Sequence, residues 1–447
     1  MEQQKVKSSF RDPSGYVYEE NGKIYRKISE SYLETYNHLM KSGLYEELIT
    51  QELIIPHKEM DFNVIKPNMV FISYPYEWSF SQLKDAAIAT LKIQQTALKF
   101  GMSLKDSSAY NIQFYKGKPV LIDTLSFEKY QEGSMWIAYK QYCQHFLAPL
   151  ALMSYVDLRL SSLLKNYIDG IPLDLAAEIL PCRSKFNLGI YLNIFVHAKS
   201  QKQHQADAKG VQGSITKFQL EALIDSLLSC TSKLKPKTQS TEWENYYTFT
   251  NYDDKSFEQK KNLVAKFIEQ ISPKKVWDLG GNIGIFSRIA ADKEIDTVSF
   301  DIDPLAIEKS YLTVKEKNEQ NILPLLLDLT NPTPAIGFAN EERDNILQRA
   351  KDIDCIMILA VIHHLAISNN LPFEKIAEYF SRMGKHLIIE FVPKEDSQVK
   401  ILLATREDIF PNYNVEGFEQ AFSNYYNLRE KQPIEGSQRI LYLMELK

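Results

Sequence analysis

The sequence predicts an α/β protein: a doubly wound, mostly parallel sheet of seven strands in the C-terminal half, preceded by an N-terminal α+β domain. Two observations lead to this prediction. Over residues 241–447, apolar runs of strand length alternate with helical patterns, which is typical of a parallel sheet covered on both faces. Before them, residues 199–213 are almost wholly polar and have little to bury, which predicts a linker.

These patterns predict three parts of the chain. We expect an N-terminal domain over residues 1–195, a polar linker with a short amphipathic helix over residues 196–240, and the second domain over residues 241–447. In the first domain, a helix is expected over residues 81–100 and a hairpin over residues 16–27.

The strands of the second domain follow from its apolar runs. Five are expected in a parallel arrangement, at residues 275–279, 297–300, 322–327, 354–360 and 386–391. Two further runs, residues 425–430 and 439–445, are separated by Pro433 and Gly436 and would form an antiparallel hairpin at the sheet edge. After the third strand, residues 331–338 contain two prolines and predict a stiff insertion, and residues 341–343 predict a solvated helix face.

The most informative motif begins where the first of these strands ends. Asp278 is followed by a turn that contains Gly280, Gly281 and Gly284, and glycine allows both φ > 0 and close approach of a ligand to the backbone. Asp301 ends the next strand, 23 residues after Asp278, which matches the spacing that places an acid against a ribose. A carboxylate beside the turn repels phosphate and attracts a cation. The motif therefore favours S-adenosylmethionine, which carries an ammonium and a sulfonium, over a dinucleotide.

At these residues the chain resembles the class I S-adenosylmethionine-dependent methyltransferases, over roughly residues 241–447. The resemblance implies which residues bind the cofactor. Those implied are Asp278, Gly280, Asn282 and Gly284 at its amino-acid part, Asp301 at the ribose hydroxyls, Ile302 at the adenine, and Asp328 at the adenine amino group with Leu329 beside it, while Gly281 and Ala360 complete the cofactor set. The terminal hairpin is also typical of this family.

The acceptor is expected at the carboxyl end of the fourth strand, because open α/β sheets bind ligands in that crevice. There His363 and His364 are the candidate catalytic residues, since a histidine near its ordinary pKa can remove a proton from an attacking oxygen or nitrogen. Alternatively, one or both start the next helix and hold the loop by hydrogen bonds. Glu390 ends the fifth strand at the same sheet edge.

Composition limits the classes of function. The chain has 447 residues, 44% of them hydrophobic, and a formal net charge of -5, so it can form two or three cores and has no general attraction to nucleic acid. Its four cysteines lack C-x-x-C spacing, which indicates neither a zinc site nor a disulfide framework, and we expect no metal. With no signal-peptide core and no apolar run of membrane-spanning length, we expect a cytoplasmic protein without a membrane partner.

A second motif lies in the N-terminal half. Asp106 and Asn111 have D-x-x-x-x-N spacing, and Asp123 follows a short strand, which is the set that kinases use to orient an acceptor hydroxyl and hold magnesium. This region resembles the protein-kinase-like and aminoglycoside-phosphotransferase-like fold. It departs from that fold at Leu104, where a histidine or arginine is usual, and it lacks a G-x-G-x-x-G loop. Lys27 is a candidate phosphate-pairing lysine, with Glu46 or Glu47 as its partner.

The sequence therefore predicts a methyltransferase that uses S-adenosylmethionine, with an N-terminal domain of kinase-like descent that aids acceptor binding or regulation. The combination is similar to bacterial methyltransferases with a nodulation-related label, which does not define the acceptor. The acceptor class stays open among small molecules, proteins and RNA. Two alternatives remain: a regulatory protein that binds S-adenosylmethionine without turnover, and an ATP-dependent phosphotransferase whose N-terminal domain binds a nucleotide.

Overall fold

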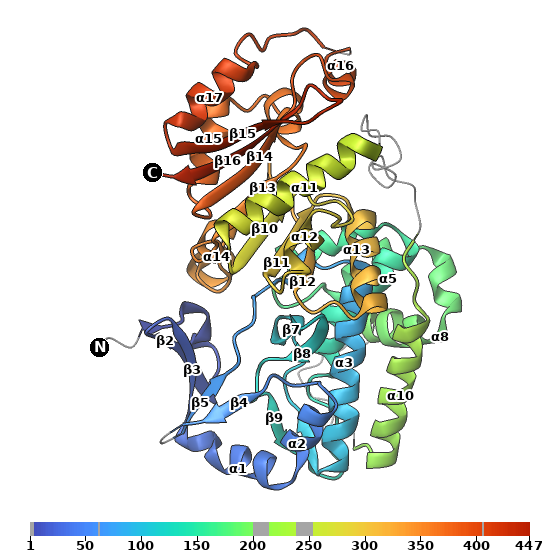
Figure 1. Ribbon diagram of the computed structural model, residues 1–447. Helices are drawn as coiled ribbons and strands as arrows, with labels where there is room; N and C mark the ends of the chain where they lie inside the picture. Colours follow the sequence, from blue (N-terminus) through green and yellow to red (C-terminus); the bar gives the residue numbers. More distant parts are fainter. Residues whose placement is uncertain (1–3, 61–62, 200–213, 238–253, 405) are drawn as a thin grey trace. The chain divides into compact units, whose positions relative to one another are not determined.

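The computed structural model describes residues 4–60, 63–199, 214–237, 254–404 and 406–447 (Figure 1). The chain divides into two compact units. Unit 1 comprises Met1–Gln239 together with Ile336–Arg343, and unit 2 comprises Ser240–Ala335 together with Asp344–Lys447. The predicted domain limits at residues 195 and 240 stay predictions, and most of the polar stretch at residues 199–213 lies outside the described residues.

Unit 1 begins with an antiparallel sheet of five strands in the order β1-β2-β3-β5-β4. Its strands are β1 (Gln4–Lys5), β2 (Gly15–Glu20), β3 (Lys23–Ile28), β4 (His57–Glu59) and β5 (Val64–Pro67). Asn21 and Gly22 join β2 to β3 with φ of 52° and 69°, and two successive positive φ values are what a tight hairpin turn requires. The hairpin expected over residues 16–27 is thus present, with Gly15 paired to Ile28.

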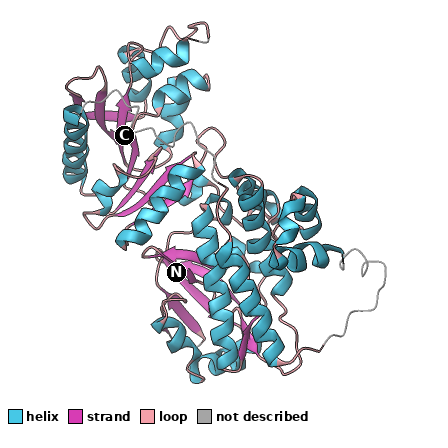
Figure 2. Cartoon of the chain, turned by 90° about the vertical axis from the view of Figure 1, so that its right-hand side faces the viewer, coloured by secondary structure: helices cyan, strands magenta, loops and turns pink. Residues whose placement is uncertain are grey.

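The rest of unit 1 is mainly helical (Figure 2). Its α-helices are α1 (Leu33–Lys41), α2 (Leu44–Thr50), α3 (Phe80–Lys99), α4 (Tyr139–Tyr142), α5 (Ala148–Tyr155), α6 (Leu163–Asn166), α7 (Leu173–Ile179), α8 (Leu188–Ile190) and α10 (Lys217–Lys233). Two small antiparallel sheets pair β6 (Met102–Leu104) with β9 (Phe127–Lys129) and β7 (Ile112–Tyr115) with β8 (Lys118–Leu121). The long helix α3 starts at a capping box in which Ser79 accepts from the Gln82 backbone amide, so its first turn is fixed locally.

Ile336–Arg343 groups with unit 1, although the flanking sequence belongs to unit 2. Glu342 accepts hydrogen bonds from the Arg11 guanidinium at 2.6 Å and from the Phe338 backbone amide at 2.7 Å. The Arg343 guanidinium lies 4.2 Å from the centre of the Tyr110 ring. The prediction of a solvated helix face at residues 341–343 is therefore wrong, because Glu342 is buried and paired rather than hydrated.

Unit 2 contains a mixed sheet of seven strands in the order β12-β11-β10-β13-β14-β16-β15 (Figure 1). The strands are β10 (Lys275–Leu279), β11 (Asp296–Asp301), β12 (Ile322–Leu326), β13 (Cys355–Ile358), β14 (His386–Phe391), β15 (Tyr426–Pro433) and β16 (Ile440–Leu446). The first five strands in chain order pair in parallel, and the final hairpin is antiparallel. The expectation of a mostly parallel sheet is thus refined to five parallel strands with an antiparallel edge.

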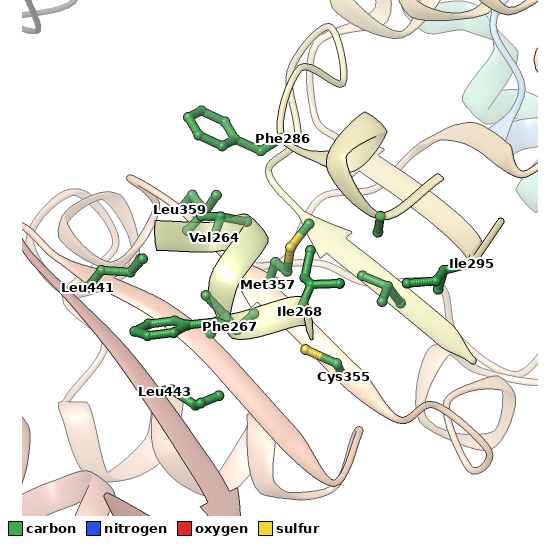
Figure 3. Close-up of a cluster of buried hydrophobic side chains, with 13 residues drawn as sticks. Val264, Phe267, Ile268, Phe286, Ile295, Cys355, Met357, Leu359, Leu441 and Leu443 are labelled. Atoms are coloured by element: carbon green, nitrogen blue, oxygen red, sulfur yellow. The ribbon is translucent and has the colours of Figure 1, made fainter. Parts of the chain in front are cut away.

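Helices cover both faces of this sheet. They are α11 (Asp254–Ile271), α12 (Ser287–Ala291), α13 (Pro304–Lys317), α14 (Ile346–Arg349), α15 (Phe373–Ser381), α16 (Ser397–Leu403) and α17 (Val415–Ser423). On one face, α11 packs through Val264, Phe267 and Ile268 in a buried cluster that includes Ile388 and Leu441 of the sheet (Figure 3).

The opposite face follows from the two-residue period of a strand. Phe391 is three residues beyond Ile388, so it projects to the other side, where its ring centre lies 6.3 Å from that of Phe373 on α15 and 5.2 Å from that of Phe418 on α17. Tyr442, next to Leu441, lies on the same side, with its ring centre 5.0 Å from that of Phe418. Strand residues are therefore apolar on both faces, as a doubly covered sheet requires.

Two compositional expectations can be compared with the structure. Cys143, Cys230 and Cys355 are buried free thiols, and Cys182 is an exposed one. Over the ranges described, every helix is too short or too polar to cross a membrane.

Candidate active site

The turn after β10 is held against the end of β11. The backbone amides of Gly280 and Gly281 both donate to the Phe300 carbonyl at 2.8 Å. Gly280 has a φ of 97°, and a Cβ there would lie 2.3 Å from Cγ2 of Val361, so this position requires glycine for both its conformation and its neighbour. Asn282 and Gly284 also have positive φ, of 50° and 81°. The predicted glycine turn is thus a tight backbone loop at the carboxyl edge of the sheet.

Asp278 lies in β10, two residues before Gly280, and is fully buried. Its Oδ2 accepts a 2.6 Å hydrogen bond from the Ser287 hydroxyl, which is also 2.8 Å from the Ser299 hydroxyl. Its Oδ1 is buried and has no hydrogen-bond partner among the described residues. Burial raises the pKa of Asp278 to about 7, although the Ser287 hydrogen bond opposes the shift. The carboxylate is therefore costly to keep ionised without a further donor or a cation.

Asp301 ties the turn to the second strand. Its Oδ2 accepts from the Asn282 backbone amide at 2.8 Å and its Oδ1 from the Asp303 backbone amide at 2.9 Å. Burial raises the pKa of this carboxyl group to about 6, and the two backbone amides oppose that shift. Asp301 thus fixes the conformation of the turn whether or not it also meets a ligand.

The remaining predicted cofactor residues lie along the same edge, because parallel strands end together. Asp301 pairs in register with Leu326, the last residue of β12, and Asp278 pairs with Met357 of β13. Asp328 and Leu329 therefore follow β12 next to Asp301. Asp328 Oδ1 accepts from the backbone amide and hydroxyl of Thr330, at 2.8 and 2.6 Å.

Ile302 and Ala360 complete the predicted set. Ile302 lies directly after β11, and its side chain is 57% exposed at this edge. Ala360 follows β13 with a φ of 56°, which is uncommon for a residue other than glycine and marks backbone strain at this edge. The structure therefore brings all ten predicted cofactor residues to one sheet edge.

His363 and His364 follow β13, where the chain enters a π-helical turn, His364–Ser368. Their ring centres are 4.1 Å apart. His363 is buried, and its Nδ1 has no hydrogen-bond partner within the described ranges. Burial lowers the pKa of His363 well below its ordinary value and the pKa of His364 to about 4, with Arg439 adding to the effect on His364. Both rings are therefore neutral at pH 7.

A buried group of four charges lies at the same end of the sheet. The Lys260 ammonium on α11 is 2.6 Å from Glu390 Oε2, and Arg439 is 3.5 Å from Glu390 Oε1. Arg439 also donates to both oxygens of Asp396, at 2.8 and 3.2 Å. The sequence placed Glu390 at this edge but did not indicate the other three. Lys260 adjoins Lys261 in a polar stretch, and nothing in the sequence distinguishes the buried lysine from the half-buried one.

The residues of unit 1 that the sequence predicted as a kinase-like set have local partners. Asp123 Oδ1 is 2.5 Å from Nη1 of Arg26, whose Nη2 is 2.9 Å from Asp12 Oδ2. Asp106 accepts from the Ser108 backbone amide at 2.9 Å, and Asn111 donates to the Ser126 hydroxyl at 3.4 Å. The residue that reaches Asp123 is thus Arg26, whereas the sequence singled out its neighbour Lys27. Across the described residues, no group of three or more His, Cys, Asp or Glu side chains is placed to hold a metal ion.

The strand order of unit 2, its antiparallel terminal hairpin and the acidic glycine turn after β10 identify the fold of the class I S-adenosylmethionine-dependent methyltransferases. The chain belongs to the family of the nodulation protein NoeA of Rhizobium meliloti (strain 1021). It is 33% identical to that protein over an alignment of 465 positions, which covers 99% of this chain and 96% of that protein. No family model matches the chain.

Three solved structures similar to this chain each cover less than half of it. The bifunctional kinase-methyltransferase WbdD is 17% identical, with a TM-score of 0.32 over 45% of this chain and 41% of that chain. The PH0226 protein from Pyrococcus horikoshii OT3 is 16% identical, with a TM-score of 0.33 over 45% and 98% of the two chains. The N-methyltransferase NodS from Bradyrhizobium japonicum WM9 is 12% identical, with a TM-score of 0.33 over 43% and 98%. The chain thus spans less than half the length of WbdD.

Proposed function

We propose that unit 2 binds S-adenosylmethionine at the carboxyl edge of β10, β11 and β12 and transfers its methyl group to an acceptor at the end of β13. The observation that supports this most strongly is the buried carboxylate of Asp278 beneath the glycine turn, with Oδ1 lacking a partner among the described residues. A cationic ligand would stabilise the ionised form of this group, which burial alone disfavours. A phosphate would instead be repelled.

The other residues of the edge fit the rest of the ligand. Asp301 retains lone pairs beyond its two backbone amides, since a carboxylate has about four acceptor positions, and these suit ribose hydroxyls. The exposed Ile302 offers an apolar surface for the adenine ring. When bound, S-adenosylmethionine supplies an electrophilic methyl group on its sulfonium.

In this proposal His363 and His364 serve the acceptor. Because both rings are neutral at pH 7, either can accept the proton that an oxygen or nitrogen nucleophile loses. Nδ1 of His363 has no hydrogen-bond partner among the residues that the structure describes, and His364 is the less buried of the two rings. Their low pKa values make them weak bases.

We assign unit 1 a role in acceptor binding or regulation rather than phosphoryl transfer. Phosphoryl transfer needs Asp123 as a magnesium ligand. Here its carboxylate is neutralised by Arg26, which also holds Asp12. A nucleotide with magnesium could therefore bind to Asp123 only if Arg26 first moved away from it.

Calorimetry tests the cofactor site directly. Asp278→Asn and Asp301→Asn should each weaken binding of S-adenosylmethionine, whereas Asp352→Asn, an exposed acid of the same unit, should leave it unchanged. An unchanged affinity for S-adenosylmethionine in both Asp278→Asn and Asp301→Asn would contradict the proposal. Incubating the protein with labelled methyl donor and a fractionated cell extract then separates an active enzyme, which labels one fraction, from a regulatory protein that binds without turnover.

A further inference from the structure

A short segment between β12 and α14 is built as a closed hairpin. We call Ile336–Arg343 the docking arm, because its neighbours in sequence belong to unit 2 whereas its own contacts place it in unit 1. Ile336 and Arg343 exchange two backbone hydrogen bonds of 3.2 Å. Gly337 has a φ of 89°, and a Cβ there would lie 2.5 Å from Cβ of Glu342, so the Glu342 side chain fills the space that glycine leaves. The docking arm is therefore a defined structure rather than a loose loop.

Contacts with two other segments of unit 1 hold the docking arm. The Glu342 side chain is only 5% exposed, and its carboxylate accepts a 2.6 Å hydrogen bond from the Arg11 guanidinium. The Arg343 guanidinium lies 4.2 Å from the centre of the buried Tyr110 ring, which is a cation–π distance. An ion pair and an aromatic contact thus fix the docking arm at two adjacent residues.

Arg11 is the main support of the buried carboxylate. Burial raises the pKa of Glu342, but hydrogen bonds from Arg11 and from the Phe338 backbone amide, together with the charges of Arg11 and Arg343, outweigh it and leave the pKa below its ordinary value. The Arg11 side chain is itself 56% exposed, so its replacement opens no cavity in a core. Without Arg11 the buried carboxylate would lose its guanidinium partner, which favours release of Glu342 to water.

The other end of the docking arm continues into the loop that carries Asp328. Pro332 and Pro334 each fix one φ angle of this loop. The Thr333 carbonyl accepts a 3.1 Å hydrogen bond from the Ile346 backbone amide, which closes the base of the hairpin. Because the hairpin is closed at its base and along its length, it moves as one body. A displacement of the docking arm therefore reaches the loop that follows β12.

We propose that Arg11 is a positioning residue for the cofactor site, acting through the docking arm on the loop that carries Asp328. This inference rests on the proposed function, in which the carboxyl edge of β12 borders the cofactor. β12 fixes the loop at one end and the docking arm fixes it at the other. Once the docking arm is released, the loop must be ordered when the ligand binds, and that entropy cost lowers the affinity.

Calorimetry of the full chain tests this inference. Arg11→Met should weaken binding of S-adenosylmethionine by about fivefold or more, which is the range of coupling between linked sites. Arg11→Lys keeps a cation for Glu342 and should restore most of the affinity. The matched control is Arg159→Met, which removes an exposed guanidinium from Asp157 in the same unit and should leave the affinity unchanged.

Hydrogen exchange measures the docking arm itself. Linkage is reciprocal, so S-adenosylmethionine should slow exchange of the backbone amides of residues 336–343 in the wild-type chain, and Arg11→Met should speed it. A melting temperature that falls in Arg11→Met while the affinity holds would show that the docking arm only supports the fold.

Two further results separate this inference from the proposed function. If the wild-type chain did not bind S-adenosylmethionine, the proposed function would fail and this inference with it. If the wild-type chain bound it and Arg11→Met bound it equally well, or if Arg159→Met weakened binding as much, this inference alone would be overturned.

Discussion

The ammonium of Lys260 lies 2.6 Å from the carboxylate of Glu390, and both side chains are almost completely buried. This ion pair joins α11 to the carboxyl end of β14, next to the edge that carries the candidate site. Arg439 approaches the second oxygen of Glu390 and is itself held by Asp396. Two positive and two negative groups therefore balance one another, which is how buried charges are tolerated.

Breaking this ion pair should be strongly destabilising. Lys260→Met or Glu390→Gln leaves a buried charge without its partner, which costs about 3–5 kcal/mol of unfolding free energy. The double variant should lose less than the sum of the two single changes. Urea denaturation of the three variants measures the coupling directly.

The exposed pair Lys375 and Glu378 on α15 is the matched control. Its side chains are 72% and 45% exposed, so the corresponding changes Lys375→Met and Glu378→Gln should each alter stability by under about 1 kcal/mol. Equal losses at the buried and exposed pairs would contradict the assignment of a buried charge network.

Asp278→Asn should have opposite effects on stability and on cofactor binding. Because the pKa of Asp278 is raised from 3.8 to about 7 in the folded chain, its contribution to stability is fully present below about pH 4 and is lost as the pH rises through 7. Asparagine does not ionise, so the variant should be more stable than the wild type at pH 8, and this advantage should shrink as the pH falls. Urea denaturation without ligand at pH 6 and pH 8 measures it.

The affinity of Asp278→Asn for S-adenosylmethionine is the control for its stability. At pH 8 the same variant should bind S-adenosylmethionine more weakly, because the cation loses a carboxylate. A variant that is merely misfolded would lose both stability and affinity. If the variant gained no stability at pH 8, or if its advantage over the wild type were equal at both pH values, Asp278 would not be the destabilising buried carboxylate inferred here.

The edge residues could be predicted from the sequence because their positions are set locally. Asp278 and Asp301 each end an apolar strand, and parallel strands end together, so strand ends alone bring them to one edge. Lys260 and Arg439 meet only through the packing of a helix on a sheet, and no short-range pattern encodes that contact. The prediction of a solvated helix face at residues 341–343 failed for a similar reason, because a polar run looks solvated until the partner of Glu342, Arg11, is known.

The histidines can be distinguished by kinetics once an acceptor is found. If one of them takes the acceptor proton, His363→Asn or His364→Asn should lower kcat by about 10²–10⁴-fold without changing the affinity for S-adenosylmethionine. His386→Asn, at the opposite end of the sheet, is the control and should leave kcat unchanged. Loss of affinity along with turnover would instead assign the histidines to holding the loop.

Arg26 should decide whether unit 1 responds to magnesium. Arg26→Met removes the partner of both Asp12 and Asp123, leaving two half-buried carboxylates that repel each other, so the melting temperature should fall. Magnesium should then stabilise the variant by bridging those carboxylates, while the wild-type chain should show no magnesium-dependent shift. Thermal melting with magnesium or with chelator measures both effects.

Arg159→Met, which frees only Asp157 from an exposed guanidinium, is the control. It should show neither the fall in melting temperature nor its recovery with magnesium. A magnesium-dependent shift of the wild-type chain would mean that Arg26 does not close this site and would return phosphoryl transfer to consideration.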